Sequence, residues 1–265
     1  MKKIRLGLIG KDVSKSDSER IHGFILVRLG YGVEYERFSV SPEAFDGAVR
    51  TLLGDFDGFN ITIPYKREVF EYLDGMEEEA VEYGSVNTVV SATRTGYNTD
   101  GKGFMQMLKF AGVSVKGKKV LILGAGGSGR SSAVALKKAG AKVFLYRRNR
   151  EELLETCTQL GVSPAEEIEK GGYEILVNCT GVGMHDSVGK SPVPISAFTG
   201  AEWAIDLIYR PEKSEFLRLG EQAGAKICNG QAMLFYQAYF ADCLFLGLVP
   251  DEAQAKSLYE EYRKE

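Results

Sequence analysis

The sequence predicts an α/β protein, on three observations. Its 265 residues, 44% of them hydrophobic, provide for one large domain or two modest ones and exclude a disordered chain. The 31 glycines against 7 prolines favour many tight strand-to-helix turns, because an average protein has about 7% glycine. Strand-like and helix-like segments alternate, and the alternation restarts after Gly101 to Gly103, which predicts two domains.

The first half of the chain follows a βαβαβ pattern. Apolar runs predict strands and helices in turn at residues 4–9, 20–29, 34–40, 42–53 and 58–63. Ser41 and Pro42 are typical of a helix N-cap and a first-turn proline. Acidic helical segments extend through Glu82, and residues 87–91 and 94–97 predict a hairpin on the edge of the same sheet.

The second half repeats the alternation more cleanly. It predicts helices at residues 104–111, 130–139, 151–159 and 215–223, and strands at residues 119–123, 142–146, 175–178, 203–206 and 226–228. Right-handed crossovers between such strands give a doubly wound parallel sheet. The last two predicted helices, 231–246 and 251–263, are expected to return to the first domain.

Charge and cysteine content exclude several classes of protein. A net charge of −3 and a pI near 5.7 argue against partners such as nucleic acid or an anionic membrane. Four scattered cysteines and two histidines predict no disulfide framework and no metal site, so a reduced cytoplasmic location is expected.

The apolar N-terminal run is too short for a signal peptide. Residues 230–250 are apolar, but Asp242 within them favours a buried helix at a domain junction over a membrane span.

A dinucleotide-binding fingerprint follows the strand predicted at residues 119–123. Gly124, Gly126 and Gly129 match G-x-G-x-x-G, with Ala125, Gly127 and Ser128 between them. In this motif the first glycine makes the turn, the second admits the pyrophosphate, and the third lets helix pack on strand. A structural glycine turn is the plain alternative. The strand before the motif, the helix after it and a second strand about twenty residues on favour a cofactor site.

The end of that second strand indicates which dinucleotide binds. An NAD site has Asp or Glu there, whereas this chain has Tyr146-Arg147-Arg148-Asn149-Arg150. Arginine binds a 2′-phosphate through paired charge-assisted hydrogen bonds, so NADP is the predicted cofactor. Cations at a helix N-terminus oppose the helix dipole, which favours a bound anion over a solvated basic turn.

The substrate site is predicted at strand ends of the first domain. Hydride transfer to a carbonyl needs a proton donor, and neither histidine lies in a convincing turn, which leaves lysine and carboxylate candidates. Lys66 follows Ile63-Pro64 at the end of a strand, and Asp100 ends the hairpin region. Ligands bind at strand ends of open α/β sheets. A solvated surface lysine is the alternative for Lys66.

Eight short motifs, in order, give the chain a family resemblance along nearly its full length. They are residues 10–18, 60–66, 84–88, 98–101, 124–130, 178–180, 206–209 and 229–237. Together they resemble the shikimate dehydrogenase family. The resemblance implies reversible NADPH-dependent reduction of 3-dehydroshikimate to shikimate, the step before shikimate is phosphorylated on the way to chorismate and the aromatic amino acids.

The resemblance also implies roles for individual residues. Lys66 and Asp100 would form the catalytic pair, and Ser16 with Ser18 would bind the substrate carboxylate. The remaining substrate contacts would come from Thr62, Asn87, Tyr209 and Gln237, and the cofactor would be held by the glycine turn with Arg147, Arg148, Leu207 and Gly230. Asp12, Lys15 and Glu19 stand where the family usually has Pro, His and Pro, which predicts a more charged and less rigid serine loop.

The expected organisation is a substrate-binding and catalytic domain over residues 1–101, joined by helices within 238–265, and an NADP-binding Rossmann domain over 102–237. Gly101 and Gly103 are either a hinge or an ordinary turn. The alternatives are a quinate/shikimate dehydrogenase with relaxed NAD or NADP use, and an inactive NADP-binding regulator. The quinate/shikimate dehydrogenase should carry an acid at the end of the second strand of the cofactor domain. The inactive regulator should lack Lys66 or Asp100. The protein is expected to be a monomer or a homodimer.

Overall fold

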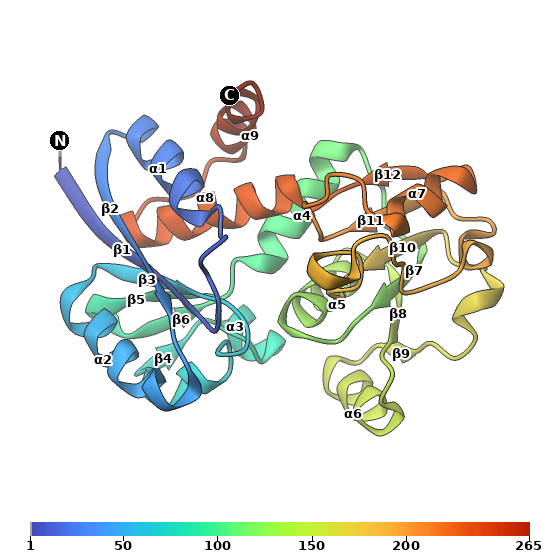
Figure 1. Ribbon diagram of the computed structural model, residues 1–265, viewed down its shortest axis with the longest axis horizontal. Helices are drawn as coiled ribbons and strands as arrows, with labels where there is room; N and C mark the ends of the chain where they lie inside the picture. Colours follow the sequence, from blue (N-terminus) through green and yellow to red (C-terminus); the bar gives the residue numbers. More distant parts are fainter. Residues whose placement is uncertain (1) are drawn as a thin grey trace. The chain divides into compact units, whose positions relative to one another are not determined.

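The computed structural model describes residues 2–265, which fold as two compact units. The first unit consists of Met1–Gly103 with Phe235–Glu265, and the second of Phe104–Leu234. Figure 1 shows the elements of both units along the chain. The chain from Phe235 onward therefore lies with the N-terminal segment. The ligand assigned to each unit stays a prediction at this point.

A mixed sheet forms the first unit, with strand order β2-β1-β3-β5-β6-β4. β1 pairs in parallel with β2 and β3, whereas β5 pairs antiparallel with β3 and β6. The predicted hairpin is thus confirmed, although it lies inside the sheet because the short strand β4 forms the edge. The strands span Lys2–Gly10 (β1), Tyr31–Ser39 (β2), Gly58–Ile61 (β3), Gly75–Met76 (β4), Thr88–Val90 (β5) and Thr95–Tyr97 (β6).

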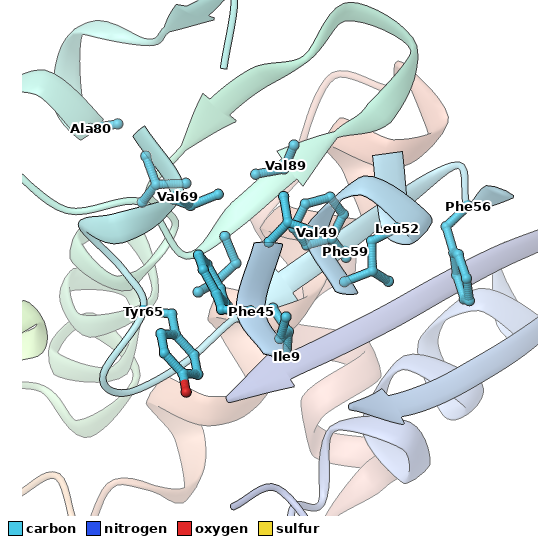
Figure 2. Close-up of a cluster of buried hydrophobic side chains, with 12 residues drawn as sticks. Ile9, Phe45, Val49, Leu52, Phe56, Phe59, Tyr65, Val69, Ala80 and Val89 are labelled. Atoms are coloured by element: carbon cyan, nitrogen blue, oxygen red, sulfur yellow. The ribbon is translucent and has the colours of Figure 1, made fainter. Parts of the chain in front are cut away.

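Helix α2 packs on one face of this sheet and closes a hydrophobic core. Phe45, Val49 and Leu52 recur at helical spacing and lie buried against Ile9 and Phe59 of the strands. Figure 2 shows this cluster, in which the rings of Phe45 and Tyr65 stack at 4.3 Å between centroids. The helices of the unit are α1 (Ser18–Arg28), α2 (Phe45–Asp55), α3 (Glu78–Tyr83), α8 (Gln231–Leu246) and α9 (Glu252–Tyr262), with 3₁₀ turns at Pro42–Ala44, Glu68–Tyr72 and Ser91–Thr93.

The second unit is a parallel sheet of order β12-β11-β10-β7-β8-β9, the doubly wound arrangement predicted from the sequence. Its core strands are apolar because helices cover both faces of a parallel sheet. The strands span Lys119–Leu123 (β7), Lys142–Tyr146 (β8), Ser163–Pro164 (β9), Ile175–Asn178 (β10), Trp203–Asp206 (β11) and Lys226–Cys228 (β12).

Helices α5, α6 and α7 connect these strands. Phe216 and Leu217 of α7 pack on Leu176 and Ala204 of the sheet, in a core that also includes Phe198. The helices span Gly127–Lys138 (α5), Arg150–Leu160 (α6) and Glu215–Gln222 (α7), and 3₁₀ turns lie at Ile168–Lys170, His185–Ser187 and Ile195–Phe198. No helix within residues 2–265 is long and apolar enough to cross a membrane.

Gly101 and Gly103, predicted as a hinge or an ordinary turn, lie in a helix. Helix α4 begins at Asp100 and runs to Ala111, so Gly101 and Gly103 lie in its first turn. A Cβ on Gly101 would lie 2.4 Å from the Tyr83 hydroxyl, and one on Gly103 would lie 2.7 Å from the backbone nitrogen of Gln237. Both glycines therefore allow neighbouring segments to approach α4 closely. The interpretation as an ordinary turn is wrong, and the hinge stays a prediction.

Candidate active site

Lys66 and Asp100 form an ion pair at the strand ends of the first unit. The Lys66 Nζ lies 2.6 Å from Asp100 Oδ2. Lys66 follows β3 and a cis Ile63–Pro64 bond, and Asp100 is the first residue of α4. The two side chains keep 12% and 7% of their exposure, so the pair is sheltered but still reached by solvent. A surface lysine with no fixed partner is thereby excluded for Lys66.

Asn87 fixes the orientation of Asp100. Its Nδ2 donates to Asp100 Oδ1 at 2.7 Å, and its Oδ1 accepts from the backbone N–H of Thr99 at 2.9 Å. Asn98 accepts from the backbone N–H of Asp100 at 3.0 Å. One carboxylate oxygen thus faces an amide and the other faces the ammonium of Lys66, and both bonds are buried or partly buried. Such an arrangement holds a carboxylate in one rotamer.

Two other predicted substrate residues lie in the same unit. Gln237 of α8 places its Oε1 3.5 Å from Asn87 Nδ2, at the limit of a hydrogen bond. Thr62 follows β3, and its backbone N–H donates to Ile9 at 2.9 Å, which keeps it beside the end of β1. The structure thus brings Lys66, Asp100, Asn87 and Gln237 together through direct contacts, whereas Tyr209 belongs to the second unit.

The serine loop lies between β1 and α1. Ser16 Oγ donates to Ser18 Oγ at 2.9 Å, and Ser18 is buried as the first residue of α1. Asp12 accepts from the backbone and hydroxyl of Ser14 at 3.1 and 2.7 Å, and Arg37 donates to the Ser14 carbonyl at 2.7 Å. The loop is as charged as predicted, but these contacts from its own acid and from β2 tie it down, so the expectation of a less rigid loop is not supported.

Asn60 is a residue of this cluster to which the sequence prediction gave no role. It lies buried in β3, and its Nδ2 donates to Thr88 Oγ1 at 3.1 Å and to the Asn87 carbonyl at 3.3 Å. Thr88 in turn donates to Asn87 Oδ1 at 2.9 Å. The available signal was a polar residue inside an otherwise apolar strand, two residues before Thr62.

In the second unit each glycine of the fingerprint has its own geometry. Gly124 adopts a φ of +100° between β7 and α5. A Cβ on Gly129 would lie 2.1 Å from the Gly124 carbonyl oxygen, whereas a Cβ on Gly126 would meet nothing within 4 Å. Gly126 occupies the N-cap of α5 without a side-chain cap. The turn therefore presents open space and the N-terminus of a helix, which fits a pyrophosphate group.

The arginines after β8 differ in their partners. Arg147 pairs with Glu152, and Arg150 pairs with Glu166 at 2.6 Å. Arg148 is exposed. Asn149 caps α6 by accepting from the N–H groups of Glu151 and Glu152. Acids within the chain therefore neutralise the guanidiniums of Arg147 and Arg150. The helix-dipole argument for a bound anion is thus weaker than the sequence indicated, and it now depends mainly on Arg148.

Asp206, at the end of β11, organises the neighbouring loops of the second unit. Its Oδ1 accepts from Asn178 Nδ2 at 3.1 Å and from the Ile208 N–H at 3.0 Å, and its Oδ2 accepts from Ser214 Oγ at 2.5 Å. Burial raises the pKa of Asp206 to about 6, against the effect of these three donors.

Leu207 and Gly230, both predicted to contact the cofactor, lie against each other in this unit. A Cβ on Gly230 would lie 2.0 Å from the Leu207 carbonyl oxygen, and the Gly230 N–H donates to Ile208 at 3.2 Å. Only glycine permits this approach. Tyr209 follows directly in the same loop. The segment after β11 is thus fixed by Asp206 on one side and Gly230 on the other.

The chain combines a doubly wound sheet, which has a glycine turn after β7, with a sheltered lysine–carboxylate pair at strand ends of another sheet. These two features define a dinucleotide-dependent oxidoreductase. The sequence model described as shikimate dehydrogenase substrate-binding domain matches residues 8–89. The chain belongs to the shikimate dehydrogenase family, since it is 38% identical over 98% of its length to the NADP(+) shikimate dehydrogenase of Caldanaerobacter subterraneus, of which it covers 96%.

Two comparisons with Thermus thermophilus agree. Its NADP(+) shikimate dehydrogenase is 37% identical, with 94% of each chain covered. A crystal structure of shikimate 5-dehydrogenase from the same organism, in complex with NADP(H) and shikimate, is 34% identical. It superimposes with a TM-score of 0.89 and covers 97% of this chain and 99% of the other. The predicted family and fold class are confirmed.

Proposed function

We propose that this chain catalyses the NADP-dependent interconversion of 3-dehydroshikimate and shikimate. The observation that carries the proposal is the Lys66–Asp100 pair, held by Asn87 in a chain whose relatives are NADP(+) shikimate dehydrogenases. An inactive NADP-binding regulator is disfavoured, because such a protein has no reason to keep an oriented, sheltered ammonium–carboxylate pair.

Lys66 is the proton donor to the reacting C3 oxygen. An ammonium has three N–H donors, and the bond to Asp100 uses one of them. A ligand oxygen can take another, which positions the proton for transfer during reduction and its return to the amine during shikimate oxidation. Asp100 holds the ammonium in place, and its Oδ1 edge and Asn87 face the neighbouring ring hydroxyls.

The serine loop recognises the other end of the substrate. Ser16 and Ser18 lie 2.9 Å apart, so their hydroxyls can donate to the two oxygens of one carboxylate. This binds an acid without a salt bridge and leaves Lys66 as the cation used at the reacting carbon. Thr62, Gln237 and Tyr209 complete the set of substrate residues.

The residues of the second unit fit NADP. The open space at Gly126 and the uncapped N-terminus of α5 suit the pyrophosphate, with Ala125, Gly127 and Ser128 forming the rest of the turn. Arg148 and Arg147 would meet the 2′-phosphate, and the backbone of Leu207 and Gly230 the nicotinamide end. Bound NADPH supplies the hydride that the substrate carbon receives.

The test is a set of four initial-rate measurements, combining shikimate or quinate with NADP or NAD. Nicotinamide reduction is followed at 340 nm, and the proposal expects the highest kcat/KM with shikimate and NADP. Fast quinate turnover, or NAD used as well as NADP, would reassign the chain to the broader quinate/shikimate type. The absence of turnover in all four mixtures would contradict the proposed reaction.

A further inference from the structure

A row of buried side-chain hydrogen bonds runs from β3 through β5 to the catalytic carboxylate. Asn60 of β3 donates to Thr88 Oγ1 at 3.1 Å, and Thr88 donates to Asn87 Oδ1 at 2.9 Å. Asn87 then donates to Asp100 Oδ1 at 2.7 Å. Each of these four residues keeps at most 5% of its surface exposed. Water therefore does not compete for these groups, and each bond constrains the next one in the row.

A backbone group sets the direction of this row. Asn60 Nδ2 also donates to the backbone carbonyl of Asn87 at 3.3 Å, and a carbonyl can only accept. The amide nitrogen of Asn60 must therefore face β5, where the Thr88 hydroxyl accepts its other proton. Because that hydroxyl carries a single proton of its own, it is left as a donor to Asn87 Oδ1.

The amide oxygen of Asn60 is held from the opposite side. The Tyr35 hydroxyl of β2 donates to Asn60 Oδ1 at 3.4 Å. The ring of Tyr35 stacks on His22 with 5.0 Å between centroids and 20° between planes. His22 is fixed in turn, because its Nδ1 lies 2.6 Å from Asp242 Oδ1 of α8 and both side chains are fully buried. Asn60 thus has a donor at its oxygen and two acceptors at its nitrogen, which leaves one orientation of its amide.

The Asn87 amide passes this order on to the ion pair. Its Oδ1 accepts from the Thr88 hydroxyl and from the Thr99 backbone N–H, both at 2.9 Å. A flipped amide would turn its nitrogen toward these two donors and its oxygen toward Asp100 Oδ1, which lies 2.7 Å away. Loss of the Thr88 hydroxyl removes one of the two donors that oppose the flip. The hydroxyl therefore influences which Asn87 atom meets the carboxylate.

We propose that Thr88 is a positioning residue of the active site. Its hydroxyl, turned by Asn60, holds the Asn87 amide so that the nitrogen faces the catalytic carboxylate. With Asp100 Oδ1 occupied in this way, Oδ2 is left for the Lys66 ammonium at 2.6 Å. The inference rests on the proposed function, because it takes Asp100 to hold the ammonium at the reacting carbon. Thr88 and Asn60 act through Asn87 and need no contact with the substrate.

The deciding variant is Thr88→Val, which keeps the branched shape and removes the hydroxyl. The kcat/KM for shikimate is expected to fall about threefold to tenfold, the range for one lost hydrogen bond, while the KM for NADP stays unchanged. Thr88→Ser restores the hydroxyl and should recover most of the loss. Thr95→Val on β6 is the matched control, since the Thr95 hydroxyl donates to the Thr93 carbonyl, and it should match the wild type. An unchanged kcat/KM in Thr88→Val, or no recovery in Thr88→Ser, would overturn the inference.

A double-mutant cycle separates positioning from a packing defect. In an Asn87→Ala background the Thr88 hydroxyl has no amide to hold, so Thr88→Val should change kcat/KM by less than about twofold. A packing defect would lower kcat/KM by the same factor in both backgrounds, which would contradict the inference. Calorimetric titration of shikimate gives the same cycle without turnover, and Thr88→Val should weaken binding only where Asn87 is present. A wild type that binds shikimate but is inactive would contradict only the proposed reaction, and one that binds none would overturn both.

Discussion

Asp100 in the first unit and Asp206 in the second are buried carboxylates with matching partners on one oxygen and different partners on the other. Each accepts from an asparagine amide, at 2.7 Å for Asn87 and 3.1 Å for Asn178. The remaining oxygen of Asp100 faces the ammonium of Lys66, whereas that of Asp206 faces the hydroxyl of Ser214. The first arrangement places an ammonium donor beside the carboxylate, and the second surrounds the carboxylate with neutral donors from neighbouring loops.

Removing the cation should give the largest effect. Lys66→Ala deletes the proton donor and should lower kcat about 100- to 10,000-fold, the usual contribution of general acid catalysis. Shikimate affinity, measured by calorimetry, should change much less, because the carboxylate and ring contacts remain. Lys102→Ala is the control, since Lys102 lies on the same helix as Asp100 but pairs with Glu77 and Glu79. Equal losses in turnover and affinity would argue against the acid role.

The buried His22–Asp242 pair extends the comparison to a carboxylate with a histidine partner. Burial raises the pKa of Asp242, and His22 opposes that rise. Asp242→Ala should destabilise the fold by about 3–5 kcal/mol, because it leaves a buried polar partner without its acceptor. The double variant His22→Phe with Asp242→Leu should lie close to the wild type. Urea titrations followed by far-UV circular dichroism measure both, and a stable single variant would contradict this reasoning.

Because the partners of Asp206 are neutral and its pKa is raised, the free energy of unfolding should depend on pH. With a pKa near 6 in the folded chain and near 3.8 in the unfolded one, the folded state holds the extra proton between pH 4 and 6. Its contribution to the free energy of unfolding therefore falls as pH rises through that window, by about 3 kcal/mol, and is constant above it.

Asp206→Asn removes that contribution, so its stability relative to the wild type should improve between pH 4 and pH 7. The single tryptophan, Trp203, begins β11 three residues before Asp206, and its fluorescence follows unfolding of this unit. A stability difference that does not change with pH would show that Asp206 titrates at an ordinary pKa.

The sequence predicted strands more accurately than it predicted contacts. β7, β8, β10, β11 and β12 have the predicted bounds because each is a short, mainly apolar run. The two-residue strands β4 and β9 have no such run and were missed. The turn interpretation of Gly101 and Gly103 was wrong because a helix breaker and a residue that allows close packing look the same in one sequence.

Partners distant in the sequence could not be predicted at all. His22 and Asp242 are 220 residues apart, and Tyr35 of β2 reaches Asn60 of β3 across β1. The carboxylates that neutralise Arg147 and Arg150 likewise become partners only once α6 and β9 are in place. Lys66 and Asp100 could be singled out because both residues stand beside strong strand-end signals, and the structure brings the two side chains into contact.

Substitution of Arg148 should give the smallest effect of these variants, and it tests how the second unit binds NADP. Because it is exposed while Arg147 and Arg150 have acid partners, Arg148→Ala should raise the KM for NADP about tenfold or more, the value of a lost charge-assisted hydrogen bond. Arg147→Ala should act less strongly and Arg150→Ala least. kcat/KM with NAD should be unchanged, since NAD lacks the 2′-phosphate. An equal loss with both dinucleotides would mean that Arg148 supports the fold of the α6 turn rather than recognising the phosphate.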